Sequence, residues 1–229
     1  MDIRRHILFE DNYLLVIDKP AGMSVEGRES VQQAAMDYLR QRWPKKNRLR
    51  AQPVHRIDRL VSGVLLLAKT PLAIQSLHGQ FARRKVSKTY LALVAKPMAA
   101  AEGTLEHWLA KDDKHRRAVL SSSSDPSAKR CVLRFRMLAS EGEFHLVEIK
   151  PLSGRYHQIR AQLAAEGNPI VGDTKYGYAG VGIGYTAICL HAYRLVFEHP
   201  KTGARMEMEA PLPRGGPWEA FRQLPRFLP

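Results

Sequence analysis

The chain has 229 residues, 45% hydrophobic and 25% charged, as is ordinary for a globular protein. Its 36 lysines and arginines exceed its 22 aspartates and glutamates, and the resulting net charge of +14 indicates a polyanionic partner, by default a nucleic acid. No apolar run approaches the ~20 residues of a membrane span and no signal-peptide core opens the chain, so the composition speaks against membrane association and predicts a cytoplasmic protein.

The first third of the chain predicts a hairpin, a helix and a buried strand. The pattern of residues 6–18 predicts the hairpin. A turn at 19–22, which contains Pro and Gly, is expected to follow it. Residues 30–43 have the apolar spacing of a helix and end before a proline. A basic linker at 45–50 then leads to an apolar run at 62–68, which is typical of a core strand.

The middle of the chain predicts a second helix and further strands. Thr70 and Pro71 have the residue types of a helix N-cap and first helical position, and residues 88–94 read as a strand. Residues 111–130 are polar and charged and are expected to form a long mobile connection. That connection fits a phosphate-binding loop and an undistinguished insertion equally well.

The last part of the chain predicts strands around one short helix. Strands are expected at 132–138 and 144–149, followed by a helix opened by residues 153–155. Its core stripe is expected to consist of Tyr156, Ile159 and Leu163, with Gly167 as the stop. Short strands follow near 170 and at 187–190, 193–198 and 205–209, and the tail beyond Pro211 is expected to wrap the surface.

These elements predict an α+β fold. With 14 prolines and 16 glycines, the chain has many turns, and it shows no repeat and no convincing internal linker. We therefore expect one domain over residues 1–229, with a core at about 7–211 and a tail rich in Pro and Arg at 212–229. Cys131 and Cys189 lie in apolar runs without metal-ligand spacing, which predicts buried thiols in a reducing compartment and no metal or organic cofactor.

The stretch before the strand at 62–68 is the candidate for chemistry. Asp58 lies between Arg56 and Arg59, and nearby cations favour an ionised carboxylate, as a nucleophile or general base requires. On the local pattern alone, a surface ion pair is the favoured interpretation. Motifs elsewhere in the chain favour the catalytic interpretation.

Five motifs, taken in chain order, favour a catalytic Asp58 over a surface ion pair. His55-Arg56-Ile57-Asp58-Arg59 with Ser62-Gly63 resembles the catalytic signature of the RluA-type pseudouridine synthases. The other resembling blocks are Asp18–Gly22, Lys88–Ala92, Gly154–Arg160 with Gly167–Asp173, and Leu190–Ala192 with His199-Pro200. The sequence departs from the family at Val61 and Gln162, and we expect no S4-type RNA-binding domain before the first block.

The resemblance implies a fold, a reaction and three catalytic residues. It implies the pseudouridine synthase fold, a mixed, mostly antiparallel central sheet flanked by helices and loops with an active-site cleft across its middle. It implies conversion of uridine to pseudouridine in RNA, with the target base flipped out of its stack. Asp58 would be the nucleophile, Arg160 would pair with it, and Tyr90 would lie against the uracil. Attack on C1′ and a glycal-forming elimination both remain open.

The resemblance and the charge together imply how RNA is bound. Ribosomal RNA, transfer RNA or both would be the partner of a monomer that needs no obligate protein partner and no cofactor. Candidate substrate-binding residues are Arg56, His55, Leu190, Arg59 and Arg116. For His55 and Leu190, simple core packing is the alternative, and His157 and His191 are expected to be structural. A catalytically idle RNA-binding protein and a base-excising glycosidase are the competing functions.

Overall fold

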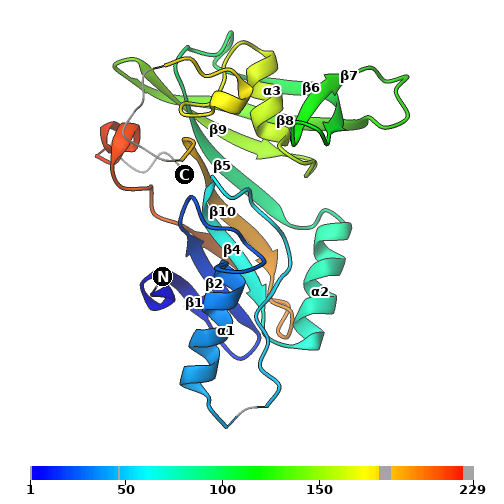
Figure 1. Ribbon diagram of the computed structural model, residues 1–229, viewed down its shortest axis with the longest axis vertical. Coiled ribbons are helices and arrows are strands. Elements are labelled where there is room, and N and C mark those ends of the chain that lie inside the picture. Colours follow the sequence, from blue (N-terminus) through cyan, green and yellow to red (C-terminus); the bar gives the residue numbers. More distant parts are fainter. Residues whose placement is uncertain (1, 46, 181–186, 224–229) are drawn as a thin grey trace. The chain divides into compact units, whose positions relative to one another are not determined.

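The computed structural model describes residues 2–45, 47–180 and 187–223, and the chain divides into two compact units (Figure 1). Unit 1 comprises Met1–Lys88 and Ala192–Pro211, and unit 2 comprises Thr89–His191 and Leu212–Pro229. Lys46 of the basic linker and the end of the tail lie outside the described residues. The single catalytic domain expected over residues 1–229 stays a prediction.

Unit 1 is built on a sheet whose central strand is fully buried. Its strands are β1 (Ile7–Glu10), β2 (Leu14–Lys19), β3 (Gln52–Pro53), β4 (Ser62–Ala68), β10 (Leu190–Glu198, in this unit from Ala192 on) and β11 (Arg205–Glu209). The order is β1-β2-β4-β10, with β3 also on β4 and β11 on β10. The antiparallel β1–β2 pair confirms the predicted hairpin, and every residue of β4 is buried, as the apolar run predicts.

Two capped helices accompany this sheet, as the sequence predicts. In α1 (Val31–Arg42), the Ser30 hydroxyl accepts a hydrogen bond from the Gln33 amide. In α2 (Pro71–Ala82), the Thr70 hydroxyl does the same for Ala73 at 3.2 Å. The short η1 (Ile3–His6) precedes β1. Apolar residues of α2 pack with those of β2, β4, β10 and β11 in one core cluster.

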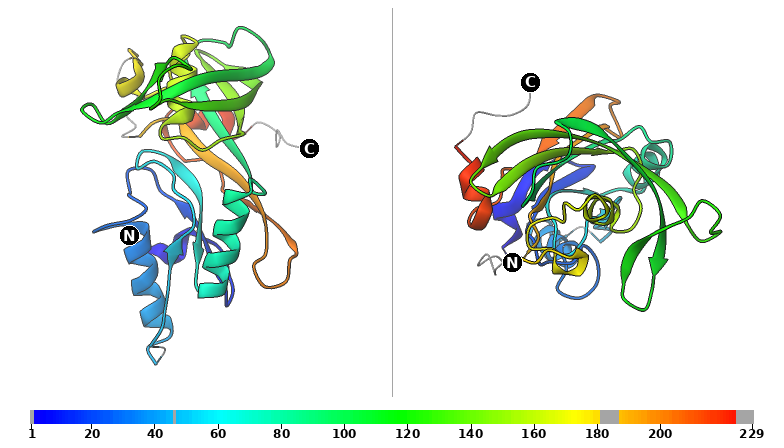
Figure 2. Two further views of the ribbon diagram at one scale, coloured as in Figure 1. Left: turned by 90° about the vertical axis from the view of Figure 1, so that its right-hand side faces the viewer. Right: turned by 90° about the horizontal axis from the view of Figure 1, so that it is seen from above.

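Unit 2 contains further strands, in the order β5-β9-β8-β6-β7. Its strands are β5 (Ser87–Val94), β6 (Glu102–Asp112), β7 (Arg117–Ser121), β8 (Lys129–Glu141) and β9 (Phe144–Pro151). All four pairs in that order are antiparallel. Figure 2 shows these strands curving around the helix α3 (Gln158–Ala165), and Ala161 of α3 packs against residues of β6, β7 and β8.

The expectation of a long mobile connection at 111–130 is wrong. The end of β6, all of β7 and the start of β8 occupy this segment. Residues 117–121 pair with β6 in an antiparallel hairpin, and the N–H and C=O of Ala118 also bond the Tyr176 hydroxyl, at 2.7 and 3.2 Å. Pairing with β6 and a contact with a distant part of the chain therefore hold a strand whose flanking residues are polar and charged.

The predicted helix after residue 153 begins later than expected. His157 has a φ of 49°, in the left-handed region, so α3 starts at Gln158. Ile159 and Leu163 are buried as predicted, but Tyr156 is 43% exposed and does not belong to the core stripe.

The end of the chain also differs from the expectation. The strands expected at 187–190 and 193–198 are replaced by the single strand β10, and near residue 170 only an isolated bridge to Val94 forms. The tail does more than wrap a surface, since Trp218 and Phe221 of η3 (Gly216–Phe221) are completely buried. None of the described helices is long and apolar enough to cross a membrane.

Candidate functional site

The turn that carries Asp58 is clamped to the turn after β2. Arg59 Nε donates to Gly22 O at 2.8 Å, and the Gly22 amide donates back to Arg59 O at 2.8 Å. Lys19, which has no exposed surface, adds a hydrogen bond from its ammonium to Arg59 O at 3.1 Å. Val61 N closes the turn on Asp58 O at 3.1 Å. The backbone around the half-buried Asp58 is therefore fixed from several sides.

Lys19 places a buried positive charge beneath this turn. Its ammonium donates to three carbonyls, those of Pro20 at 2.9 Å, Met23 at 2.7 Å and Arg59. Burial lowers the pKa of Lys19 from its ordinary 10.5 to about 8, although the negative charge of Asp58 acts in the opposite direction. The clamp thus holds a cation within electrostatic reach of the Asp58 carboxylate.

The other candidates of the Asp58 motif differ in their surroundings. His55 Nε2 accepts a hydrogen bond from the Leu66 amide at 3.1 Å, and its ring stacks on Phe81 with centroids 5.1 Å apart. Burial and the nearby Lys88 charge lower the pKa of His55 to about 3, so the ring is neutral. These contacts favour the packing alternative for His55. Arg56 is exposed and therefore accessible to RNA.

Arg59 also reaches an open groove of about 1050 Å³ in unit 1. Arg4 and Arg28 line the groove with it, and the acidic side chains there are Asp2, Glu29 and Asp37. Asp37 is paired with Arg40 at 3.0 Å, and Asp2 lies 3.6 Å from Arg5. Because these two carboxylates have cations of their own, the lining arginines remain candidates for phosphate contacts.

In unit 2, Arg160 is held rigidly by a carboxylate that the sequence did not single out. Its Nε and Nη2 donate to Asp173 Oδ2 at 2.7 Å and Oδ1 at 2.9 Å, and both residues are buried. Its Nη1 donates to His157 Nε2 at 3.0 Å. The guanidinium also lies 5.0 Å from the centroid of the Tyr176 ring. Bidentate pairing fixes the plane as well as the position of the guanidinium.

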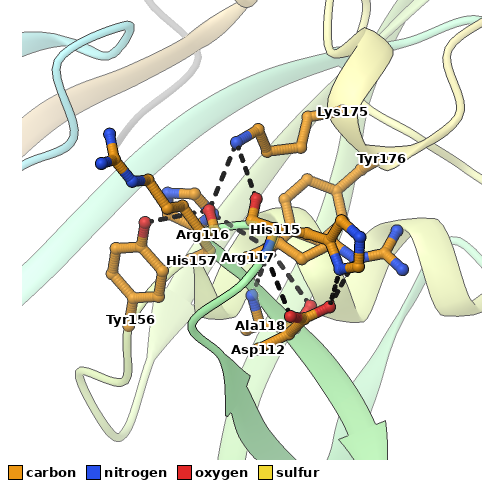
Figure 3. Close-up of polar contacts among 9 residues, drawn as sticks. All are labelled: Asp112, His115, Arg116, Arg117, Ala118, Tyr156, His157, Lys175 and Tyr176. Atoms are coloured by element: carbon orange, nitrogen blue, oxygen red, sulfur yellow. Dashed lines mark hydrogen bonds and ion pairs between the residues drawn. The ribbon is translucent and has the colours of Figure 1, made fainter.

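His157 connects Arg160 to the β6–β7 hairpin (Figure 3). Since Nε2 accepts from Arg160, Nδ1 carries the proton and donates to the Tyr176 hydroxyl at 3.0 Å. That hydroxyl bonds both backbone groups of Ala118 in β7. His157 is thus a hydrogen-bonded structural residue, as the sequence predicts.

Figure 3 also shows the surroundings of Arg116, at the turn between β6 and β7. Its carbonyl accepts hydrogen bonds from the Tyr156 hydroxyl at 3.1 Å and from Lys175 Nζ at 3.3 Å. Its exposed guanidinium points away from the Asp112 carboxylate. Asp112 is occupied by His115 at 2.7 Å and by Arg117 at 3.4 Å.

The remaining candidates of unit 2 lie on strands. Tyr90 is half-buried in β5, opposite Ile149 of β9. Leu190, at the start of β10, is 3% exposed, as core packing requires. His191 is buried and meets Trp218 edge-on, with ring centroids 6.1 Å apart. A structural role for His191 agrees with this contact.

The predicted site residues fall into two groups. Asp58, His55, Arg56 and Arg59 belong to unit 1, whereas those of unit 2 are Tyr90, Arg116, Arg160 and Leu190. The three-residue combination of Asp58, Tyr90 and Arg160 therefore stays a prediction.

Sequence reasoning missed three residues as members of these arrangements, namely Lys19, Asp173 and Tyr176. Lys19 and Asp173 lie within the motif blocks, and that position is the sequence signal that could have identified them. Within the described part of the chain, no cluster of His, Cys, Asp and Glu side chains could hold a metal ion.

Comparison with known proteins gives a consistent result. Residues 13–165 match the family described as RNA pseudouridylate synthase. The ribosomal large subunit pseudouridine synthase C of Yersinia pestis is 39% identical over 214 residues, which are 90% of this chain and 65% of that protein. The protein of the same name from Escherichia coli (strain K12) is 35% identical over 219 residues, 91% of this chain and 67% of that protein.

Solved structures show the same fold. Human RNA pseudouridylate synthase domain containing 4 superposes with a TM-score of 0.78 at 24% identity, over 93% of this chain and 90% of that one. Human RNA pseudouridylate synthase domain containing 1 superposes with a TM-score of 0.73 at 26% identity, over 90% of this chain and 82% of that one. The predicted α+β fold is thereby confirmed.

Proposed function

This chain belongs to the RNA pseudouridylate synthase family, and from that membership we propose that it converts uridine to pseudouridine in ribosomal RNA. The family match over residues 13–165 is the observation that carries the proposal, and it confirms the resemblance found in the motifs. The names of the Yersinia pestis and Escherichia coli relatives support ribosomal RNA of the large subunit over transfer RNA. The chain spans only 65% of the Yersinia pestis protein. The activity is therefore a proposal, and the residues of this chain must support it too.

The reaction needs no oxidant and no cofactor. The N-glycosidic bond between N1 of uracil and C1′ of ribose breaks, the base rotates, and C5 forms a new bond to C1′. C5 then loses its proton, and N1 gains one, so that the product is an isomer of the substrate. A group that enables the first cleavage must be ionised at the start, which a carboxylate near a fixed cation satisfies.

Asp58 is the proposed nucleophile. Its turn is held by reciprocal hydrogen bonds between Gly22 and Arg59, and the buried Lys19 ammonium adds a positive charge below it. A fixed backbone keeps the carboxylate in one place, which is how positioning contributes to catalysis. These contacts support the assignment over a surface ion pair, whose side chains would be mobile and solvated.

Arg160 and Tyr90 are the proposed partners of Asp58. Asp173 and His157 hold the Arg160 guanidinium in one orientation, which suits a residue that keeps a nucleophile charged and aligned. Tyr90 is half-buried on β5, and a partly accessible aromatic ring suits contact with the uracil face. Removal of the C5 proton is the further step proposed for Tyr90.

RNA binding is proposed to depend mainly on charge. The net charge of +14 supplies cations for phosphate, and the exposed Arg56, Arg59 and Arg116 are proposed to bind the substrate directly. Contacts with the phosphate backbone would offset the few kcal/mol that flipping a base requires. We further propose that the protein acts as a cytoplasmic monomer without an obligate protein partner.

Mapping pseudouridines nucleotide by nucleotide tests this function directly. Ribosomal and transfer RNA are taken from cells with the gene, without it, and with it restored. Loss of specific pseudouridines from large-subunit ribosomal RNA, with recovery on restoration, is the expected result. Loss confined to transfer RNA would refute the substrate, and unchanged maps would favour a catalytically idle RNA-binding protein.

A further inference from the structure

Tyr156 presents an exposed aromatic ring that is fixed in place. One face stacks on the His157 ring, with centroids 3.9 Å apart and an angle of 20° between the planes. The hydroxyl donates to Arg116 O at 3.1 Å, which prevents the ring from swinging away (Figure 3). Nevertheless, 43% of the residue is exposed. A ring held in this way loses little conformational entropy when a second planar group stacks on it.

The backbone on both sides of this contact is unusual. Arg116 and His157 each have a φ of 49°, a conformation that non-glycine residues rarely adopt. Such conformations persist where surrounding contacts enforce them, and they cluster at functional sites. Here the hydrogen bond from Tyr156 to Arg116 and the stacking on His157 join the two strained positions.

The cations of Arg116 and Lys175 lie beside the exposed ring. Lys175 Nζ donates to two carbonyls, His115 O at 3.2 Å and Arg116 O at 3.3 Å, neither of which carries a compensating negative charge. Lys111 Nζ lies 5.9 Å from the centroid of the Tyr156 ring, but its charge is paired with Asp113. Arg116 has no carboxylate partner among the residues that the structure describes.

This combination matches the chemistry of single-stranded RNA. Proteins bind unpaired bases by stacking them on aromatic rings, and cations beside the ring bind the phosphates. Bases inside a duplex have both faces covered and cannot use such a ring. An acidic peptide would use the cations but would leave the exposed ring face without a planar partner.

We propose that Tyr156 is a stacking platform for an unpaired base next to the target uridine, and that Arg116 and Lys175 bind its phosphate. The proposal rests on the function proposed above, because His157, which backs the platform, is bonded directly to Arg160. Residue 156 is also the variable position within the Gly-Arg-x-His-Gln-Ile-Arg block. The platform therefore offers this chain a means of selecting its own RNA.

Fluorescence of 2-aminopurine tests the stacking. The probes are hairpin RNAs whose loop holds one uridine, with 2-aminopurine on its 5′ or its 3′ side. Binding of the wild-type protein is expected to quench one of the two probes. Tyr156→Leu is expected to abolish that quenching and to weaken binding about tenfold. Tyr156→Phe and Tyr156→Trp keep a ring and are expected to retain the quenching.

Matched variants separate stacking from charge and from general surface effects. Leu152 is 45% exposed in the same unit, and Leu152→Ala is expected to leave quenching unchanged. Arg116→Asn, with a residue tolerant of positive φ, is expected to reduce the slope of log affinity against log salt by about one while quenching persists. An unchanged slope would remove Arg116 from the proposal.

Two outcomes distinguish this inference from the proposed function. Equal quenching and affinity for the wild type and Tyr156→Leu would overturn the platform, whatever the catalytic activity. Absence of tritium release from 5-tritiated uridine in ribosomal RNA by the wild-type protein would count against the proposed function alone. Quenching that depends on the ring, together with tritium release by the wild type, would support both.

Discussion

Replacing Lys19 with methionine should change the stability of the protein in a pH-dependent manner. Burial lowers the pKa of Lys19 from 10.5 to about 8, which corresponds to about 3 kcal/mol of destabilisation by the charge at neutral pH. Three hydrogen bonds to carbonyls oppose this cost, at roughly 1.5–3 kcal/mol for each bond to a charged group. We therefore expect Lys19→Met to lower the free energy of unfolding by roughly 1.5–6 kcal/mol at pH 7.

The direction of the pH effect follows from the two pKa values of Lys19. Below pH 8 the ammonium is protonated in the folded and unfolded states, and its unfavourable burial is fully present. Between pH 8 and 10.5 the folded state releases the proton first, so the unfolded state binds more protons and stability rises with pH. Between about pH 7 and pH 10, the free energy of unfolding of the wild type should thus rise by about 2–3 kcal/mol relative to that of Lys19→Met.

Urea titrations of both proteins across this pH range measure the difference. Titration of groups that Lys19 does not influence cancels between the two proteins, and Lys45→Met, at an exposed lysine, is the matched control. The free energies of unfolding of the control and the wild type should differ by the same amount at every pH. A constant difference for Lys19→Met as well would refute a buried Lys19 ammonium with a lowered pKa beneath the Asp58 turn.

Three further predictions concern packing, the buried ion pair and RNA binding. Gly63→Ala should lower the free energy of unfolding by at least about 2 kcal/mol, because its Cβ would lie 2.2 Å from Ala192 O at a φ of 111°. Gly203→Ala, at a φ of 72° with no atom within 4 Å, should cost less, and equal losses would contradict the close contact. Arg160→Ala should cost about 3–5 kcal/mol by leaving Asp173 buried and unpaired, whereas the exposed Arg155→Ala should cost under about 0.5 kcal/mol, as thermal or urea unfolding would show. Affinity for RNA should fall at least about tenfold between roughly 50 and 200 mM salt, and a flat response would contradict phosphate-dominated binding.

The sequence predicts best where local signals and burial agree. Ser30 and Thr70 mark the starts of α1 and α2 because a capping hydroxyl acts on amides only a few residues away. The run at 62–68 is a buried strand because its residues leave no polar face. In these elements, short-range chemistry and the core favour the same structure.

The sequence predicts poorly where distant contacts override the local pattern. Residues 117–121 form β7 by pairing with β6, and Tyr176, far along the chain, bonds the backbone of Ala118 as well. The apolar spacing of Tyr156 predicts a core position, but the left-handed His157 turns it outward. Neither effect can be predicted from the spacing of apolar residues along the chain.

The candidate site shows the same division. The motifs predict Asp58 and Arg160 as site residues, whereas they do not single out the residues that hold them in place. Lys19 and Asp173 act through burial and hydrogen bonds that only the folded chain reveals. Such supporting residues orient a site, but no spacing pattern in the sequence identifies them.

Asp58→Asn tests the central claim most directly. The substitution keeps the shape of the side chain and removes the charge that a nucleophile needs. With RNA containing 5-tritiated uridine, we expect no release of tritium and an affinity for RNA within about threefold of the wild type, since phosphate contacts dominate binding. Undiminished tritium release by Asp58→Asn would contradict the assignment of Asp58 as the nucleophile.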